Sequence, residues 1–167
     1  MAQVTIAVDG ERLALTTIQV EETDRLFSLP PVQHPMDVSL GGTARLAGFS
    51  LESETVRAGE PFSLTLYWEA IAPDPVDTGY TVFVHLIGPE ERIIAQHDGA
   101  PAGGEWPVTA WAPGQVIVDT HKLTFHDVTY RGQARLAVGL YDPVTLQRLA
   151  TPLGEDRILL PISISVE

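Results

Sequence analysis

The chain has 167 residues and no cysteine, and its 22 acidic against 10 basic residues give a formal net charge of −12. The length suits one domain of ordinary size, and the lack of cysteine excludes disulfides, a thiolate nucleophile and Cys-ligated metal clusters. The acidic balance argues against nucleic acid as a partner, because a phosphate-binding surface needs a basic patch.

The N-terminal residues predict a β-hairpin followed by a linker. Residues 3–8 alternate in polarity, Asp9-Gly10 is a strong hairpin turn, and residues 12–20 alternate again. Three prolines within residues 29–35 favour an extended linker over a central strand. We therefore expect two parts: residues 1–36, a hairpin and Pro-rich linker that either packs on the main body or does not, and residues 37–167, the main domain.

The main body consists of short apolar or alternating stretches separated by turn residues. The clearest is 62–71, which places Phe62, Leu64, Leu66 and Trp68 on one face. Both faces of 80–87 are apolar, so we expect that strand in mid-sheet. The further strands are expected at 44–52, 92–96, 116–125, 133–141, 146–149 and 158–166.

No stretch predicts an amphipathic helix. The spacing of strands and turns predicts an all-β domain with little or no helix, an antiparallel β-sandwich of about eight to ten strands, immunoglobulin-like or jelly-roll. A barrel is the alternative.

Residues 98–115 form the most individual segment, a loop rich in proline and glycine that carries Trp106 and Trp111. We expect the two tryptophans to fold onto the adjacent sheet, because burying such large rings is strongly favourable. The alternative is that they stay exposed and offer flat platforms to a sugar. The candidate ligand-binding residues, on the assumption that they share one outer face and this loop, are Tyr67, Phe83, His85, Asp98, Trp106, Trp111 and Tyr141.

Catalytic and metal motifs give weak signals. The sequence has no G-x-S-x-G nucleophile elbow and no H-E-x-x-H metal motif. On strand parity, His85 and His97 are placed to meet across a hairpin beside Asp98, a weak candidate for a divalent-metal site. Asp98, Glu105 and Asp119 offer oxygen ligands for calcium, although not in the spacing of a calcium-binding loop. We expect no catalytic residue, no bound metal and no cofactor.

A series of spaced motifs within residues 62–149 carries a family resemblance: LTLYW, YTVFVHL, AQHDGAP and AVGLYDP, in that order. Together with LAGFSLES they make residues 37–166 resemble the extracytoplasmic C-terminal β-sandwich region of bacterial multi-spanning glycosyltransferases of the dolichyl-phosphate-mannose type. The resemblance implies a location outside the membrane, after the last transmembrane helix. It implies no catalysis, because the catalytic residues of such enzymes lie in their membrane portion.

These expectations combine into a non-catalytic accessory module, associated with a glycosyltransferase-like membrane protein and contacting a glycan or a neighbouring protein domain. The sequence itself has no signal peptide, and no apolar run reaches the roughly 20 residues that a membrane helix needs, so we expect no direct membrane insertion. A carbohydrate-binding module with an aromatic face is the first alternative. A small hydrolase is the second and least favoured.

Overall fold

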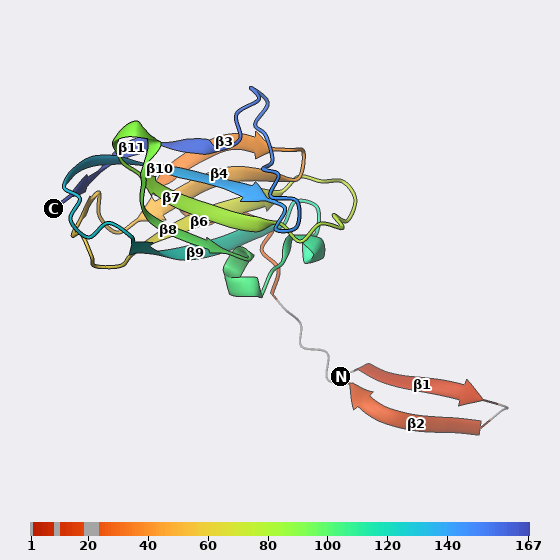
Figure 1. The fold of residues 1–167 in the computed structure, drawn as a ribbon. Helices are drawn as coiled ribbons and strands as arrows, with labels where there is room; N and C mark the ends of the chain where they lie inside the picture. The colour runs from red at the N-terminus through yellow and green to blue at the C-terminus, as the bar shows by residue number, and fades with distance from the viewer. Residues whose placement is uncertain (1, 9–10, 19–23) are drawn as a thin grey trace.

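The computed structural model describes residues 2–8, 11–18 and 24–167, and in these ranges the protein is all-β with three short 3-10 turns and no α-helix. Figure 1 shows the arrangement. The strands are β1 (Ala2–Val8), β2 (Glu11–Ile18), β3 (His34–Leu40), β4 (Ala44–Leu51), β5 (Thr55–Val56), β6 (Phe62–Ala70), β7 (Thr81–Ile87), β8 (Ile93–Gly99), β9 (Val116–Phe125), β10 (Gly132–Tyr141) and β11 (Ile158–Val166). The 3-10 turns are η1 (Pro89–Glu91), η2 (Pro101–Gly104) and η3 (Val108–Ala110). No helix in the described part of the chain is long and apolar enough to cross a membrane.

One sheet of nine strands, in the order β3-β4-β6-β9-β8-β7-β10-β11-β5, makes up the main body. Its pairs are antiparallel except β11 with β5, which is parallel. The sheet curls at the seam between β8 and β9, where two residue pairs join the strands, Ala95 with Phe125 and Gln96 with Thr124. The two halves on either side of this seam therefore face one another.

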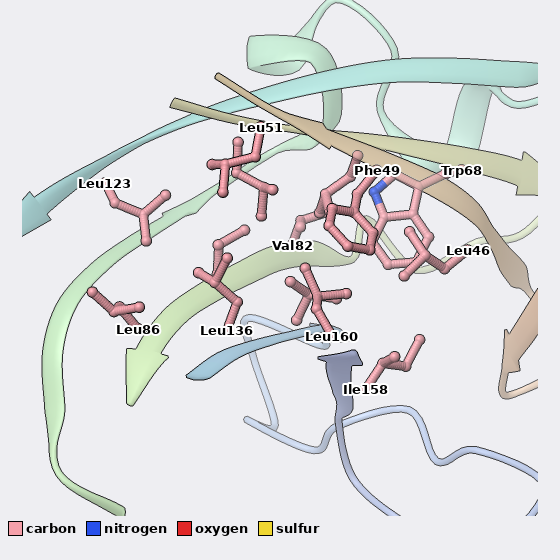
Figure 2. Packing of buried hydrophobic residues seen from close by; sticks show 14 of the residues in the cluster. Leu46, Phe49, Leu51, Trp68, Val82, Leu86, Leu123, Leu136, Ile158 and Leu160 are labelled. Atoms are coloured by element: carbon pink, nitrogen blue, oxygen red, sulfur yellow. The ribbon is translucent and has the colours of Figure 1, made fainter. Parts of the chain in front are cut away.

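The core lies between these two halves. Figure 2 shows Leu46, Phe49 and Trp68 from one half packed toward Val82 and Leu160 from the other. The alternation of β6 explains its place, because Leu64, Leu66 and Trp68 are buried while the residues between them are partly exposed. Burial of such apolar side chains contributes about 1.5–3 kcal/mol each.

The expectation of an all-β, mainly antiparallel protein is confirmed. The strand at 62–71 lies where it was expected, and β1 and β2 pair as the predicted hairpin, whose turn at Asp9-Gly10 lies outside the described residues. Two strands were missed, β3 and the two-residue β5. Conversely, 146–149 is not a strand and contributes one isolated bridge, between Arg148 and Tyr141.

The strand β3 begins within the segment that we expected to be a linker. Its Pro35 is compatible with a strand because β3 is at the edge of the sheet, where a missing N–H removes no hydrogen bond on the open side. The preceding residues also contact the main body: Leu26 accepts a hydrogen bond from Val116 N at 2.8 Å. Residues 24–36 are therefore joined to the sheet rather than separate from it.

Candidate functional site

A cluster of aromatic and polar side chains occupies the face of β7, β8 and β10 that points away from the core. Phe83 lies opposite Asp98 on one side and Gly139 on the other. His85 and Tyr141 are on the same face, and both rings lie beside Phe83, with centroids 5.0 and 6.3 Å from its own. The sequence therefore correctly placed Phe83, His85, Asp98 and Tyr141 together.

This cluster is covered and internally hydrogen-bonded. Phe83 is 1% exposed, with the guanidinium of Arg148 4.3 Å above its ring centre. Its ring also fills the space above Gly139, where an added Cβ would lie 2.5 Å from a ring carbon. His85 Nε2 lies 3.2 Å from Asp98 Oδ1. The buried rings of Phe83 and His85 therefore offer no flat face to a sugar, which argues against the alternative of an aromatic sugar-binding surface at these two residues.

The carboxylate of Asp98 is stabilised in its ionised form. Partial burial alone would raise its pKa, but hydrogen bonding to His85 and Tyr141 and the nearby histidines outweigh burial and hold the pKa of Asp98 below its ordinary value. Burial raises the pKa of the Tyr141 hydroxyl, and the charge of Asp98 raises it further. Asp98 therefore acts as a hydrogen-bond acceptor for its neighbours, not as a proton donor.

Tyr67 does not belong to this face. It lies on β6, opposite Gly48 and Val118, in the other half of the curled sheet. Its neighbours along β6, Leu66 and Trp68, point into the core, so Tyr67 points to the outer face of that half. The prediction that Tyr67 shares a surface with Phe83 and Tyr141 is wrong. Strands β9 and β8 lie between β6 and β7, and the sheet bends between β9 and β8, so the outer faces of its two halves point in different directions.

The loop tryptophans fold inward. Trp111 is 8% exposed and belongs to the core cluster, and its Nε1 donates a hydrogen bond to the Trp106 carbonyl oxygen at 2.8 Å. Trp106 is half-buried against the same core, and the guanidinium of Arg25 lies 4.6 Å above its ring. Trp111 is buried as expected and has no exposed ring for a ligand, but it lies in the main core and not on the outer face of Phe83 and His85.

The seam between β8 and β9 holds a second, buried polar network that the sequence analysis did not identify. The carboxylate of Asp119 is fully buried and accepts three hydrogen bonds: from Trp68 Nε1 at 3.1 Å, from Ala102 N at 2.8 Å and from His121 Nε2 at 2.7 Å. His121, 1% exposed, contacts His97 through their Nδ1 atoms at 2.8 Å.

The proton positions in this network follow from its partners. With Asp119 as the acceptor, we assign the proton of His121 to Nε2, so that its Nδ1 accepts from His97 Nδ1–H. Burial lowers the pKa of His97, and the proximity of His121 lowers it further. Ala102 belongs to η2, so its hydrogen bond to Asp119 holds this turn against β9, next to the point where the pairing of β8 with β9 ends.

A metal site at His85, His97 and Asp98 is not assembled. The register pairs His85 with Gln96 and His97 with Val84, so the two imidazoles point to opposite faces of the sheet. The calcium set is also dispersed, with Asp98 on the outer face, Asp119 in the core and Glu105 exposed to solvent. Over residues 24–167, no group of three His or acidic side chains is placed to hold a metal ion.

The open side of the curled sheet carries a groove of about 630 Å³. One wall is formed by consecutive residues of the edge strand β3, and the other by the connection between β10 and β11 and the first residues of β11. Its lining combines apolar side chains with polar ones, two of them carboxylates: Met36, Asp37, Val38, Ser39, Thr151, Pro152, Leu153, Glu155, Ile158 and Leu159. Leu153, one of the lining residues, is 87% exposed.

Comparisons with known proteins leave the family open. No family model matches the chain, and no curated protein matches it. Among solved structures, the CARDB domain of the PF1109 protein from Pyrococcus furiosus, crystallised in complex with di-metal ions, is similar at 11% identity with a TM-score of 0.44. The match covers 90% of this chain and 100% of that one.

Proposed function

We propose that this protein is a non-catalytic interaction module of the β-sandwich type, immunoglobulin-like or jelly-roll, which binds a neighbouring protein through the groove between β3 and β11. The observation that carries the proposal is the groove itself, where apolar side chains stay accessible beside an open strand edge. Accessible apolar surface of this kind is typical of protein-binding sites.

The polar clusters support a non-catalytic role. Asp119 has its oxygens occupied by three donors, and Asp98 is held by His85. The groove is lined by other residues and contains no histidine. The groups of these clusters whose pKa is shifted, His97, Asp98 and Tyr141, would therefore not contact a molecule bound in the groove. Acid–base chemistry needs a titratable group within hydrogen-bond reach of the substrate.

The setting of this module is part of the same proposal. The ordered motifs within residues 62–149 support an extracytoplasmic location and an association with a multi-spanning glycosyltransferase-like protein. In that setting the neighbouring protein is another extracytoplasmic segment of the same assembly.

Proximity labelling in the native host tests the proposal. The chain, fused to a peroxidase, is compared with a groove variant, Leu153→Lys/Glu155→Lys, and with a matched control, Val144→Lys/Glu105→Lys, which changes one exposed apolar and one exposed acidic residue outside the groove. We expect a multi-spanning glycosyltransferase among the proteins labelled by the wild type and the control, and at least severalfold less of it with the groove variant.

Two results would contradict the proposal. One is a set of labelled proteins that does not differ between the groove variant and the wild type. The other is a glycan-array signal that disappears in Trp106→Ala while thermal stability is kept, because that outcome identifies a carbohydrate-binding module.

A further inference from the structure

We infer that the groove between β3 and β11 receives an extended peptide of alternating apolar and basic residues, which adds to β3 as a further strand. This inference rests on the proposed function and names the chemistry of the partner. It would make recognition depend on backbone hydrogen bonds of β3, with side-chain preferences set by the groove lining.

The open edge of β3 provides the backbone template. β3 is the terminal strand of the sheet and pairs with β4 on one side. On its other side no strand of the described chain is paired, and the four consecutive residues Met36, Asp37, Val38 and Ser39 line the groove. Unpaired N–H and C=O groups along an edge strand readily pair with a further extended chain.

The opposite wall is also the edge of a strand. Ile158 and Leu159 begin β11 and pair with Val138 and Ala137 of β10. On the other side of β11, β5 pairs only with Ser165 and Val166, near the end of the strand. Figure 1 shows β3 and β11 on the same side of the molecule, where the sheet has curled without closing. A peptide in this groove would therefore lie between two strand edges.

The pairing segment is short and bounded at both ends. Pro35 lacks an N–H, and the register of β3 against β4 shifts between Pro35 and Val38, which bends the start of the strand. Beyond the end of β3, Gly41 N already donates to Ala150 O at 2.9 Å. The free edge is therefore confined to residues 37–40, which favours a defined register over indiscriminate pairing.

The lining defines the side chains of the partner. Met36, Val38 and Leu153 favour apolar side chains on the face of the peptide that enters the groove. Asp37 and Glu155 are exposed carboxylates on the two walls, and the cation beside Asp37, Arg45, is shared with Glu69. With a net charge of −12, the chain as a whole attracts a cationic partner and disfavours a second copy of itself.

Panning and NMR together test the inference. A phage library of random heptapeptides is panned on the wild type and counter-selected on Leu153→Lys/Glu155→Lys. We expect enriched sequences that alternate apolar residues with Lys or Arg. Adding a synthetic peptide of the enriched sequence should shift the amide resonances of residues 37–40 and slow their hydrogen exchange.

A backbone-modified peptide separates strand addition from charge attraction. The same peptide with N-methyl groups on alternate residues, made in both alternations, keeps every side chain but loses its donors on one edge. We expect at least about tenfold weaker binding for one of the two forms, which corresponds to about 1.4 kcal/mol. Binding to Val144→Lys/Glu105→Lys should equal wild-type binding.

The inference is overturned if no sequence is enriched over the counter-selected variant, if both N-methylated forms bind as well as the parent, or if the shifted resonances lie outside β3 and β11. These results are distinguishable from failure of the proposed function. A groove variant that loses its labelled neighbour while no peptide adds to β3 supports the interaction module and refutes strand addition.

Discussion

Replacing Asp119 by alanine should strongly destabilise the fold. The substitution removes the acceptor of two buried donors, Trp68 Nε1 and His121 Nε2, and of the partly buried Ala102 N. Each buried donor left without a partner costs about 1–3 kcal/mol, and three donors lose their acceptor together. We expect Asp119→Ala to lower the free energy of unfolding by about 3–5 kcal/mol, a large part of the 5–15 kcal/mol of a typical domain.

Asparagine at position 119 should cost less. Its amide oxygen still accepts from two of the donors, but its NH₂ group then faces the third, so we expect a loss of about 1–3 kcal/mol. Thr120→Ala is the matched control, because Thr120 is the next residue of β9 but is exposed. Its effect should stay within about 0.5 kcal/mol, apart from a small contribution from its exposed contact with Thr65.

Urea denaturation followed by tryptophan fluorescence and far-UV circular dichroism measures these differences. Hydrogen exchange of the Ala102 amide adds a local test, because its protection depends on the hydrogen bond to Asp119. The reasoning is refuted if Asp119→Ala loses less than about 1 kcal/mol, or if Thr120→Ala is equally destabilising, since either result would mean that the network does not hold the seam.

Three further substitutions test other parts of the fold. The pKa of His97 is lower in the folded chain than its ordinary value of 6.5, so the unfolded chain binds more protons below that pH. Stability should therefore fall as the pH drops below about 6.5, and the fall should be smaller in His97→Gln; identical pH profiles would contradict the assigned shift. Gly139→Ala should lose about 1–3 kcal/mol, because its Cβ would overlap the ring of Phe83, and an unchanged melting temperature would show that Phe83 moves freely. Trp111→Ala should lose about 3–5 kcal/mol, more than Trp106→Ala does, and the reverse order in thermal melts would contradict the assigned burial.

The sequence predicts the strands well because alternation is a local property. Phe62–Ala70 alternates clearly, and it lies in mid-sheet with its even-numbered residues in the core. The same rule could have identified the buried network. In Val116–Phe125, Asp119 and His121 have the parity of Ile117, Leu123 and Phe125, all of which are buried, so the pattern places a carboxylate and an imidazole in the core.

Register is what the sequence could not provide. Whether His85 meets His97 depends on how β7 pairs with β8, and a shift of one residue reverses the face of every side chain. The pairing of His85 with Gln96 separates them. Likewise, the curl at β8–β9 moves Tyr67 to another surface, and no local pattern encodes where a sheet bends. Phe83 and Asp98 were therefore placed together correctly, whereas His85 and His97, on the same two strands, and Tyr67, across the seam, were not placed correctly.

The sequence also showed no sign of the groove, which lies along the open edge of β3. An edge strand without a partner is normally protected along its length, because an open edge invites aggregation. In β3 the protection is confined to the first half, at Pro35 and the register shift that follows it, while Val38 and Ser39 face an accessible groove. The hydrogen-bonded carboxylates are instead used within the fold, where Asp119 holds η2 and Asp98 holds His85 beside Phe83. Strand β3 is thus protected from pairing at its beginning and accessible at its end, with the exposed Leu153 on the opposite wall of the groove. This combination is expected of an edge strand that binds a partner.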